Sequence, residues 1–148
     1  MTRQDYATPA DFIAAVANRF GPIVTDLAAS LANTKAAKFY DREVDSLSQP
    51  WAERDPFGNL WLNPEFRDIG PWARKCREES AHRDGLIFLL TPASIGTEWF
   101  ASHVHRSALV LGLSPRIAFE GCADPYPKDL MLSVFGKATS GFDVWRWR

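Results

Sequence analysis

The sequence predicts an α/β protein in which a mostly parallel sheet is flanked by helices. Segments with apolar residues at helical spacing alternate along the chain with short apolar runs of strand length. One of these runs, residues 86–90, is apolar throughout, which is typical of a strand covered on both faces of a parallel sheet. The length of 148 residues, without an internal repeat or a Gly/Ser linker, indicates a single domain over residues 1–148.

The composition excludes several classes of protein. With 46% hydrophobic and 24% charged residues, the chain can bury a core and is not of the disordered type. The N-terminus lacks the hydrophobic region of a secretory signal, and the longest apolar run is too short to cross a bilayer. Because Cys76 and Cys122 are too few for a disulfide framework or a zinc site, we expect a cytoplasmic protein without a bound metal.

The first helix is predicted to begin at Thr8, which suits the N-cap, with Pro9 at the first helical position. Gly21 and Pro22 follow its last turn and end it. Its apolar residues share one face at helical spacing: Phe12, Ile13, Val16, Ala17 and Phe20.

Strands are expected next at residues 23–25 and 59–62. Between them, residues 33–40 fit either a helical turn or a short strand, and residues 45–51 are interpreted as a loop. The second strand runs directly into Asn63.

The second half of the chain begins with an amphipathic helix at residues 72–83, whose inward face holds Ile69, Trp72, Ala73 and Cys76. The elements expected after it are a strand at 86–90, a short helix at 97–104, strands at 108–113 and 130–135, and an edge strand of alternating pattern at 142–147. Ligands of such sheets bind beyond the carboxyl ends of the strands.

The tetrad Asn63-Pro64-Glu65-Phe66 follows the strand at 59–62, where that rule expects a site. An Asn-Pro pair alone marks a turn in most proteins. Here the residues around it, 59–66 and then 69–72, resemble the NPP(Y/F) region of the phage-type (Dam-like) DNA N-6-adenine methyltransferases. Further segments resemble the same family in the same order: 7–9 with Phe12, 25–30 with Asn33, 39–40, 45–47 with Trp51, 89–93, and 97–100.

The resemblance covers nearly the whole chain and implies a compact, Rossmann-like, S-adenosylmethionine-dependent methyltransferase fold. It implies an enzyme, encoded by a phage or prophage and acting in the host cytoplasm, that methylates the 6-amino group of adenine in DNA. The adenine would be flipped out of the duplex.

The family pattern also implies roles for individual residues. Asn63 and the carbonyl of Pro64 would hold the adenine amine, and Phe66 would stack on the base. Lys128 is a candidate contact to DNA phosphate. The cofactor contacts implied by the resemblance are Thr8, Asp26, Ala28 and Asp45.

Each of these residues also has a simpler interpretation. Thr8 fits a helix start, Asp26 a turn or cap, and Asp45 a solvated loop. Glu65 departs from the family pattern, in which a second proline is usual and fixes the turn through its locked φ. The net charge of −1 requires that any DNA contact come from a local patch.

Two other functions therefore remain open from the sequence. One is a methyltransferase-fold protein that has lost catalysis and acts as a binding or decoy protein. The other is methylation of a different planar amine, such as a free nucleotide or a protein amide.

Overall fold

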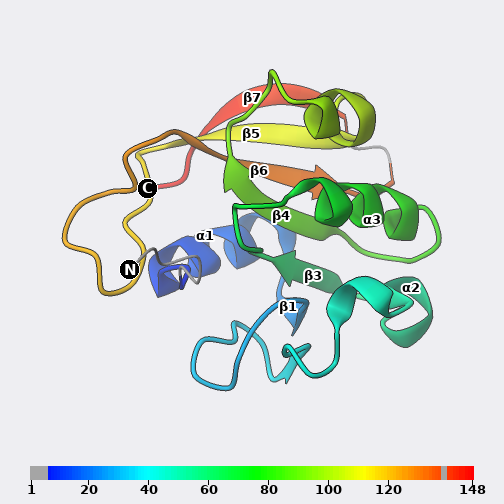
Figure 1. The fold of residues 1–148 in the computed structure, drawn as a ribbon. Helices are drawn as coiled ribbons and strands as arrows, with labels where there is room; N and C mark the ends of the chain where they lie inside the picture. The colour runs from blue at the N-terminus through cyan, green and yellow to red at the C-terminus, as the bar shows by residue number, and fades with distance from the viewer. Residues whose placement is uncertain (1–6, 138–139) are drawn as a thin grey trace.

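The computed structural model describes residues 7–137 and 140–148, and these form a mixed sheet of seven strands with helices on both faces (Figure 1). The strand order is β2-β1-β3-β4-β6-β5-β7. The strands are β1 (Ile23–Asp26), β2 (Lys38–Phe39), β3 (Asn59–Leu62), β4 (Ile87–Pro92), β5 (Ala108–Ser114), β6 (Leu130–Phe135) and β7 (Gly141–Arg146). The helices are α1 (Ala10–Phe20), η1 (Ser46–Ser48), α2 (Trp51–Arg54), α3 (Gly70–Ser80) and η2 (Phe100–Val104).

The α/β class is confirmed, and the sheet combines parallel and antiparallel pairings. Strands β2, β1, β3 and β4 run parallel to one another. Strand β6 is antiparallel to both β4 and β5, while β7 is parallel to β5. The chain returns from β5 to β6 through residues 115–129 without a crossover helix, and such a return produces an antiparallel pair. The predicted edge strand is confirmed, because β7 lies at one end of the sheet.

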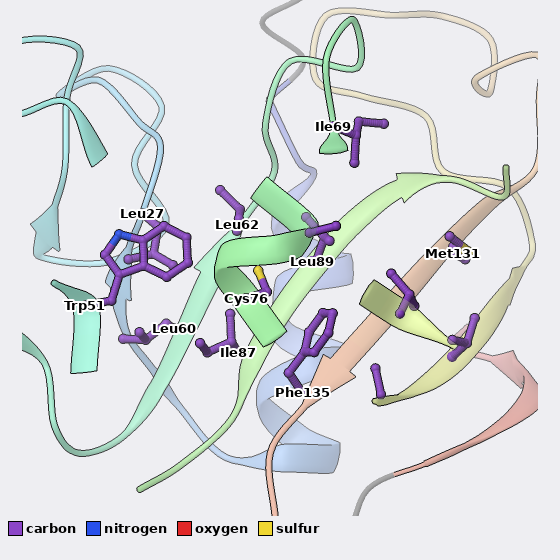
Figure 2. Packing of buried hydrophobic residues seen from close by; sticks show 14 of the residues in the cluster. Leu27, Trp51, Leu60, Leu62, Ile69, Cys76, Ile87, Leu89, Met131 and Phe135 are labelled. Carbon is purple, nitrogen blue, oxygen red and sulfur yellow. The ribbon is translucent and has the colours of Figure 1, made fainter. Parts of the chain in front are cut away.

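The central strands are buried on both faces, as the apolar run predicts. In β3, Leu60 packs into the core on the side of α3, whereas Trp61 packs on the side of α1. Figure 2 shows Cys76 of α3 over the first of these faces, close to Leu60 and Ile87. On the opposite face the ring of Phe12 in α1 meets Trp61 with centroids 6.2 Å apart.

The first helix is confirmed, but its predicted N-cap is wrong. Helix α1 begins at Ala10 with Pro9 as the N-cap, and no side chain caps it. The amide of Ile13 donates to the carbonyl of Pro9 at 3.2 Å, so the backbone alone closes the first turn. The hydroxyl of Thr8 is engaged elsewhere, by Asn63.

The predicted end of the next helix differs because a side chain binds the backbone of a distant segment. The helix predicted at 72–83 spans Gly70–Ser80. Arg83 is buried and donates to the carbonyls of Asp55 at 2.9 Å and Gly58 at 2.5 Å, which holds it in a turn.

The loop predicted at 45–51 contains the short helix η1, and Trp51 at its end begins α2. The indole of Trp51 is buried and donates to the carbonyl of Ser46 at 2.9 Å, so this segment is drawn inward. The ambiguous segment 33–40 contains the short strand β2, and the helix predicted at 97–104 includes the π-helical turn η2. No helix among the described residues is long and apolar enough to span a membrane.

Candidate active site

The parallel half of the sheet brings the ends of three strands to one edge. Backbone hydrogen bonds continue the pairing just past the strands. The amide of Leu27 donates to the carbonyl of Trp61 at 2.8 Å, and that of Tyr40 donates to the carbonyl of Asp26 at 2.9 Å. The segments that follow β1, β2 and β3 therefore lie side by side, where ligands of parallel sheets bind.

A cavity of about 800 Å³ opens between these three segments; we call it the first cavity. Its polar and apolar walls come from the ends of β1 and β2, from η1 and from the tetrad. The residues that line it are Leu27, Ala28, Ala29, Ser30, Asn33, Tyr40, Asp41, Arg42, Glu43, Asp45, Ser46, Leu47, Asn63, Pro64, Glu65, Arg67, Asp68 and Trp72.

Two of the four predicted cofactor residues, Ala28 and Asp45, line the first cavity. Ala28 is half-buried beside the end of β1. Asp45 has a left-handed backbone with φ of 56°, which aspartate tolerates better than most residues. Its carboxylate accepts a hydrogen bond from the hydroxyl of Ser48 at 3.0 Å.

Asp26 lies behind the cavity wall and holds that wall in place. Its two carboxylate oxygens accept hydrogen bonds from the amides of Ala28 at 3.2 Å and Lys35 at 3.0 Å. Burial raises the pKa of Asp26 to about 6, although these bonds and the charge of Lys35 act in the opposite direction. Its geometry is that of a turn residue, and its contact with a cofactor stays a prediction.

Asp41 is a site residue to which the sequence pattern did not point. It follows β2 and lines the first cavity, and its Oδ1 accepts from the amide of Val44 at 3.1 Å. In dinucleotide-binding sheets, an acidic residue some 20 residues beyond the first strand turn binds a ribose hydroxyl. The sequence did not single out Asp41 because residues 33–40 do not read clearly as a strand.

The buried carboxylate of Asp55 holds the ends of β1 and β2 together. It accepts from Thr25 Oγ1 at 2.9 Å, from Lys38 Nζ at 2.5 Å, and from the hydroxyl of Tyr40. Burial acts to raise the pKa of Asp55, but these three hydrogen bonds outweigh it and leave the pKa below its usual value. The ring of Tyr40 is thereby anchored in the wall of the first cavity.

The first two tetrad residues meet the N-terminal segment. Asn63 is half-buried, and its Nδ2 donates to Oγ1 of Thr8 at 3.0 Å. Pro64 is buried beside it, and both tetrad residues line the first cavity. Thr8 itself is only 1% exposed and is absent from the cavity wall, so its predicted contact with a cofactor also stays a prediction.

Glu65, the residue that departs from the family pattern, is paired with two arginines. Its carboxylate lies 3.4 Å from Nη2 of Arg42 and 2.9 Å from Nη2 of Arg67. Both arginines are exposed, so these pairs contribute little to stability. They do offset the negative charge that Glu65 brings to the rim of the first cavity.

A second cavity, of about 640 Å³, lies on the other side of the tetrad. Phe66 lines it, and its ring packs edge-on against Tyr126 with centroids 5.7 Å apart. Tyr126 and Lys128 both come from the connection between β5 and β6. The residues that line the second cavity are Phe66, Arg67, Asp68, Ile69, Gly70, Pro92, Ser94, Thr97, Glu98, Trp99, His103, Tyr126 and Lys128.

His103 in the second cavity is favoured in its neutral form. Burial lowers its pKa, and the nearby guanidinium of Arg77 lowers it further. Nδ1 of His103 accepts from Nε of Arg77 at 3.3 Å, which requires that this nitrogen carry no proton. Among the described residues, no group of three or more His, Cys, Asp or Glu side chains could hold a metal ion.

The fold and site define an α/β protein with two ligand-sized cavities at the carboxyl edge of its parallel strands, separated by a strand-end Asn-Pro tetrad. The chain belongs to the DNA N-6-adenine-methyltransferase (Dam) family, whose model matches residues 1–130. The match includes the tetrad and all strands before β6, which confirms the resemblance seen in the sequence.

A curated relative supports the same family. The DNA N-6-adenine-methyltransferase of Escherichia phage T1 is 27% identical to this chain over 143 residues. The aligned region covers 94% of this chain and 58% of the relative, so the chain spans a little over half of the length of the protein it matches.

Proposed function

We propose that this protein transfers the methyl group of S-adenosylmethionine to the 6-amino group of adenine in DNA. The observation that carries the proposal is the position of the tetrad between two cavities of different chemistry. Asn63, Pro64 and Glu65 line the first cavity, and Phe66 lines the second. A transferase needs this arrangement because its donor and its acceptor must meet at one point from separate sites.

The first cavity fits the cofactor in size and in charge. S-adenosylmethionine carries a sulfonium and an ammonium against one carboxylate, so it is a cation, and when bound it supplies an electrophilic methyl group. The cavity wall contains two arginines, Arg42 and Arg67, and a larger number of carboxylates: Asp41, Glu43, Asp45, Glu65 and Asp68. An acidic wall stabilises a bound cation.

Within this cavity, individual residues suit individual parts of the cofactor. Asp41, after β2, is suited to accept hydrogen bonds from the ribose hydroxyls. Asp45 is suited to accept from the amino group of the cofactor's adenine, and the small side chain of Ala28 leaves room beside it. Asp26 supports this wall through the amides of Ala28 and Lys35.

The tetrad supplies the chemistry on the acceptor amine. The 6-amino group of adenine is a poor nucleophile because its lone pair is delocalised into the ring. In the proposal, Oδ1 of Asn63 and the carbonyl of Pro64 accept hydrogen bonds from its two N–H groups, which localises the lone pair toward the donor. As the N–CH₃ bond forms, the S–CH₃ bond would break to leave S-adenosylhomocysteine, and the methylated amine would release one proton to solvent. Glu65 does not enter this step, and its charge is offset by Arg42 and Arg67.

The second cavity suits a flipped-out adenine and its phosphate. Aromatic faces hold an unstacked base with about 1–3 kcal/mol each, and Phe66 and Tyr126 bring two rings to this cavity. Lys128 on the same wall is suited to phosphate. Arg67 lines the wall as well but is paired with Glu65, and Asp68 and Glu98 add carboxylates. With a net charge of −1, the protein is expected to bind DNA weakly and with strong dependence on salt.

The proposal includes a Rossmann-like methyltransferase fold and a phage or prophage origin. The fold is supported by parallel strands β1, β3 and β4, helices on both faces, and cavities beyond the strand ends. The phage T1 relative supports the origin.

The decisive test is transfer of labelled methyl groups from S-adenosylmethionine to unmethylated DNA by the purified protein. Asn63→Ala is expected to lower kcat by about 100-fold or more, because it removes an acceptor that acts in the transition state. Calorimetry with S-adenosylhomocysteine should show unchanged affinity in the same variant.

The outcomes separate the alternatives. A protein that binds the cofactor product but methylates no DNA would be either the catalytically inactive relative or an enzyme for a different planar amine, and labelled methyl transfer to free nucleotides and to protein distinguishes these two. If none of these accepts a methyl group, Glu65→Pro tests whether the missing proline is the cause. A protein that ignores both cofactor forms cannot be a methyltransferase.

A further inference from the structure

The hydrogen bond between Thr8 and Asn63 joins the segment before α1 to the tetrad, across 55 positions of sequence. Nδ2 of Asn63 donates to Oγ1 of Thr8 at 3.0 Å. Thr8 is only 1% exposed. The segment is fixed on both sides, because the amide of Glu120 donates to the carbonyl of Ala7 at 3.0 Å and the carbonyl of Pro9 begins α1.

The hydroxyl of Thr8 has no part in starting the helix. Pro9 is the N-cap of α1, and no side chain caps that end. Thr8 does not line the first cavity, whereas Asn63 does. Any effect of this hydroxyl on a ligand in that cavity is therefore transmitted through the carboxamide of Asn63.

The orientation of that carboxamide matters because its two ends have nearly the same shape and opposite hydrogen-bonding character. An amine substrate offers N–H donors and needs the carboxamide oxygen as acceptor. If the carboxamide were turned by 180°, its NH₂ group would face the amine and two donors would oppose each other. In the structure Oγ1 of Thr8 accepts from Nδ2, and this hydrogen bond stabilises the orientation in which the NH₂ end of the carboxamide points to Thr8.

We propose that Thr8 is a positioning residue that holds the NH₂ end of the Asn63 carboxamide and thereby directs Oδ1 toward the acceptor amine. The proposal rests on the methyl-transfer function proposed above. It assigns Thr8 an action through Asn63 in place of a direct contact with the cofactor.

The test compares Thr8→Val, which keeps the shape and removes the hydroxyl, with Thr8→Ser, which keeps the hydroxyl. For Thr8→Val we expect kcat for DNA methylation to fall about tenfold or more, the value of a lost hydrogen bond of about 1.4 kcal/mol. KM for S-adenosylmethionine and the Kd for S-adenosylhomocysteine should stay within about twofold. Thr8→Ser should recover most of kcat.

Thr34→Val is a matched control. Thr34 is half-buried, its hydroxyl donates to the carbonyl of Ala36 at 2.7 Å, and neither residue lines a cavity. It reports what the loss of a threonine hydroxyl does through stability alone, and kcat at a temperature well below unfolding should not change.

A measurement without turnover distinguishes failure of this proposal from failure of the proposed function. In protein labelled with ¹⁵N-asparagine, the Asn63 side-chain NH₂ should exchange slowly with solvent in the wild type and in Thr8→Ser, and faster in Thr8→Val. An unchanged kcat or unchanged exchange in Thr8→Val would overturn the positioning role. A raised KM for S-adenosylmethionine with unchanged kcat would instead support direct cofactor contact. If the wild type methylates no DNA, the proposed function fails, and the role of Thr8 in methylation fails with it. The exchange rates would then report only whether Thr8 holds the Asn63 carboxamide.

Discussion

The two cavities that flank the tetrad are similar in size and differ in chemistry. The wall of the first has an excess of carboxylates, whereas carboxylates and basic side chains are equal in number on the second, which presents the rings of Phe66 and Tyr126. In the proposed function, this difference would direct a cationic donor and a flat, anionic acceptor to different sides of the same four residues. A local patch of this kind would let a protein of net charge −1 offer a surface to nucleic acid.

The two cavities also differ in what supports them. Beneath the first lie hydrogen-bonded carboxylates, Asp26 and Asp55, which tie the strand ends together. The second is held by packing of aromatic rings, with Phe119 against Tyr126 at 5.7 Å between centroids. The first cavity should therefore respond to pH and to loss of single acceptors, and the second to loss of apolar contact.

The largest expected effect concerns Asp26 behind the first cavity. Burial raises its pKa from 3.8 to about 6. Its contribution to stability is thus fully present below about pH 4 and is lost as the pH rises through 6. Between these limits the free energy of unfolding of the wild type should fall by about 3 kcal/mol relative to Asp26→Asn, which has no such titration.

Denaturant unfolding of both proteins at a series of pH values measures this difference, and other titrating groups cancel in it. If the free energy of unfolding has the same pH dependence in both proteins, burial does not perturb the carboxyl group of Asp26. The proposed difference in what stabilises the two cavities would then be wrong.

An intermediate effect is expected at the wall of the first cavity itself. Asp41→Asn removes a charged acceptor, and hydrogen bonds to charged groups contribute about 1.5–3 kcal/mol. The Kd for S-adenosylhomocysteine should rise by about tenfold or more, measured by calorimetry, while binding of a DNA oligonucleotide changes little.

Asp84→Asn is the control for charge alone, because Asp84 pairs on the surface with Lys137 at 3.6 Å and lines neither cavity. An equal loss of affinity in both variants would mean that Asp41 acts only through net charge. A loss of DNA binding in Asp41→Asn would break the division between the two cavities.

The smallest effect is expected in the second cavity. Phe66→Ala removes one ring from the proposed base site, worth about 1–3 kcal/mol, so kcat/KM for DNA should fall by about 5-fold to 100-fold. Affinity for S-adenosylhomocysteine should be retained. Phe142→Ala serves as control, since Phe142 is an exposed aromatic residue on β7. Weaker cofactor binding in Phe66→Ala would show that the cavities are not separate sites.

Much of the fold could be predicted from local patterns. The apolar run before Thr91 became the buried strand β4, and helical spacing after Pro9 became α1. The position of the tetrad directly after a strand could also be predicted, because an apolar strand and an Asn-Pro turn are both recognised from neighbouring residues.

The boundaries that were wrong share one cause. Arg83 ends the region of α3 by binding the carbonyls of Asp55 and Gly58, and Trp51 begins α2 by burying its indole. The contacts of Arg83 lie outside the window over which periodicity is read, and Trp51 is buried by a core cluster that distant segments complete, so local propensity is overridden by tertiary packing.

The sequence by itself determined the α/β class, the tetrad and the family, because strand and helix periods and the order of short motifs are written along the chain. Only the tertiary structure decided that Thr8 holds Asn63 and that Asp41 lines the first cavity. It also decided that Glu65 is paired with arginines. The contacts of Thr8 with Asn63 and of Arg42 with Glu65 depend on the order of the strands and on how the loops meet at their ends. Asp41 lines the cavity because β2 pairs beside β1. A hydrogen bond across 55 positions has no counterpart in the spacing of neighbouring residues.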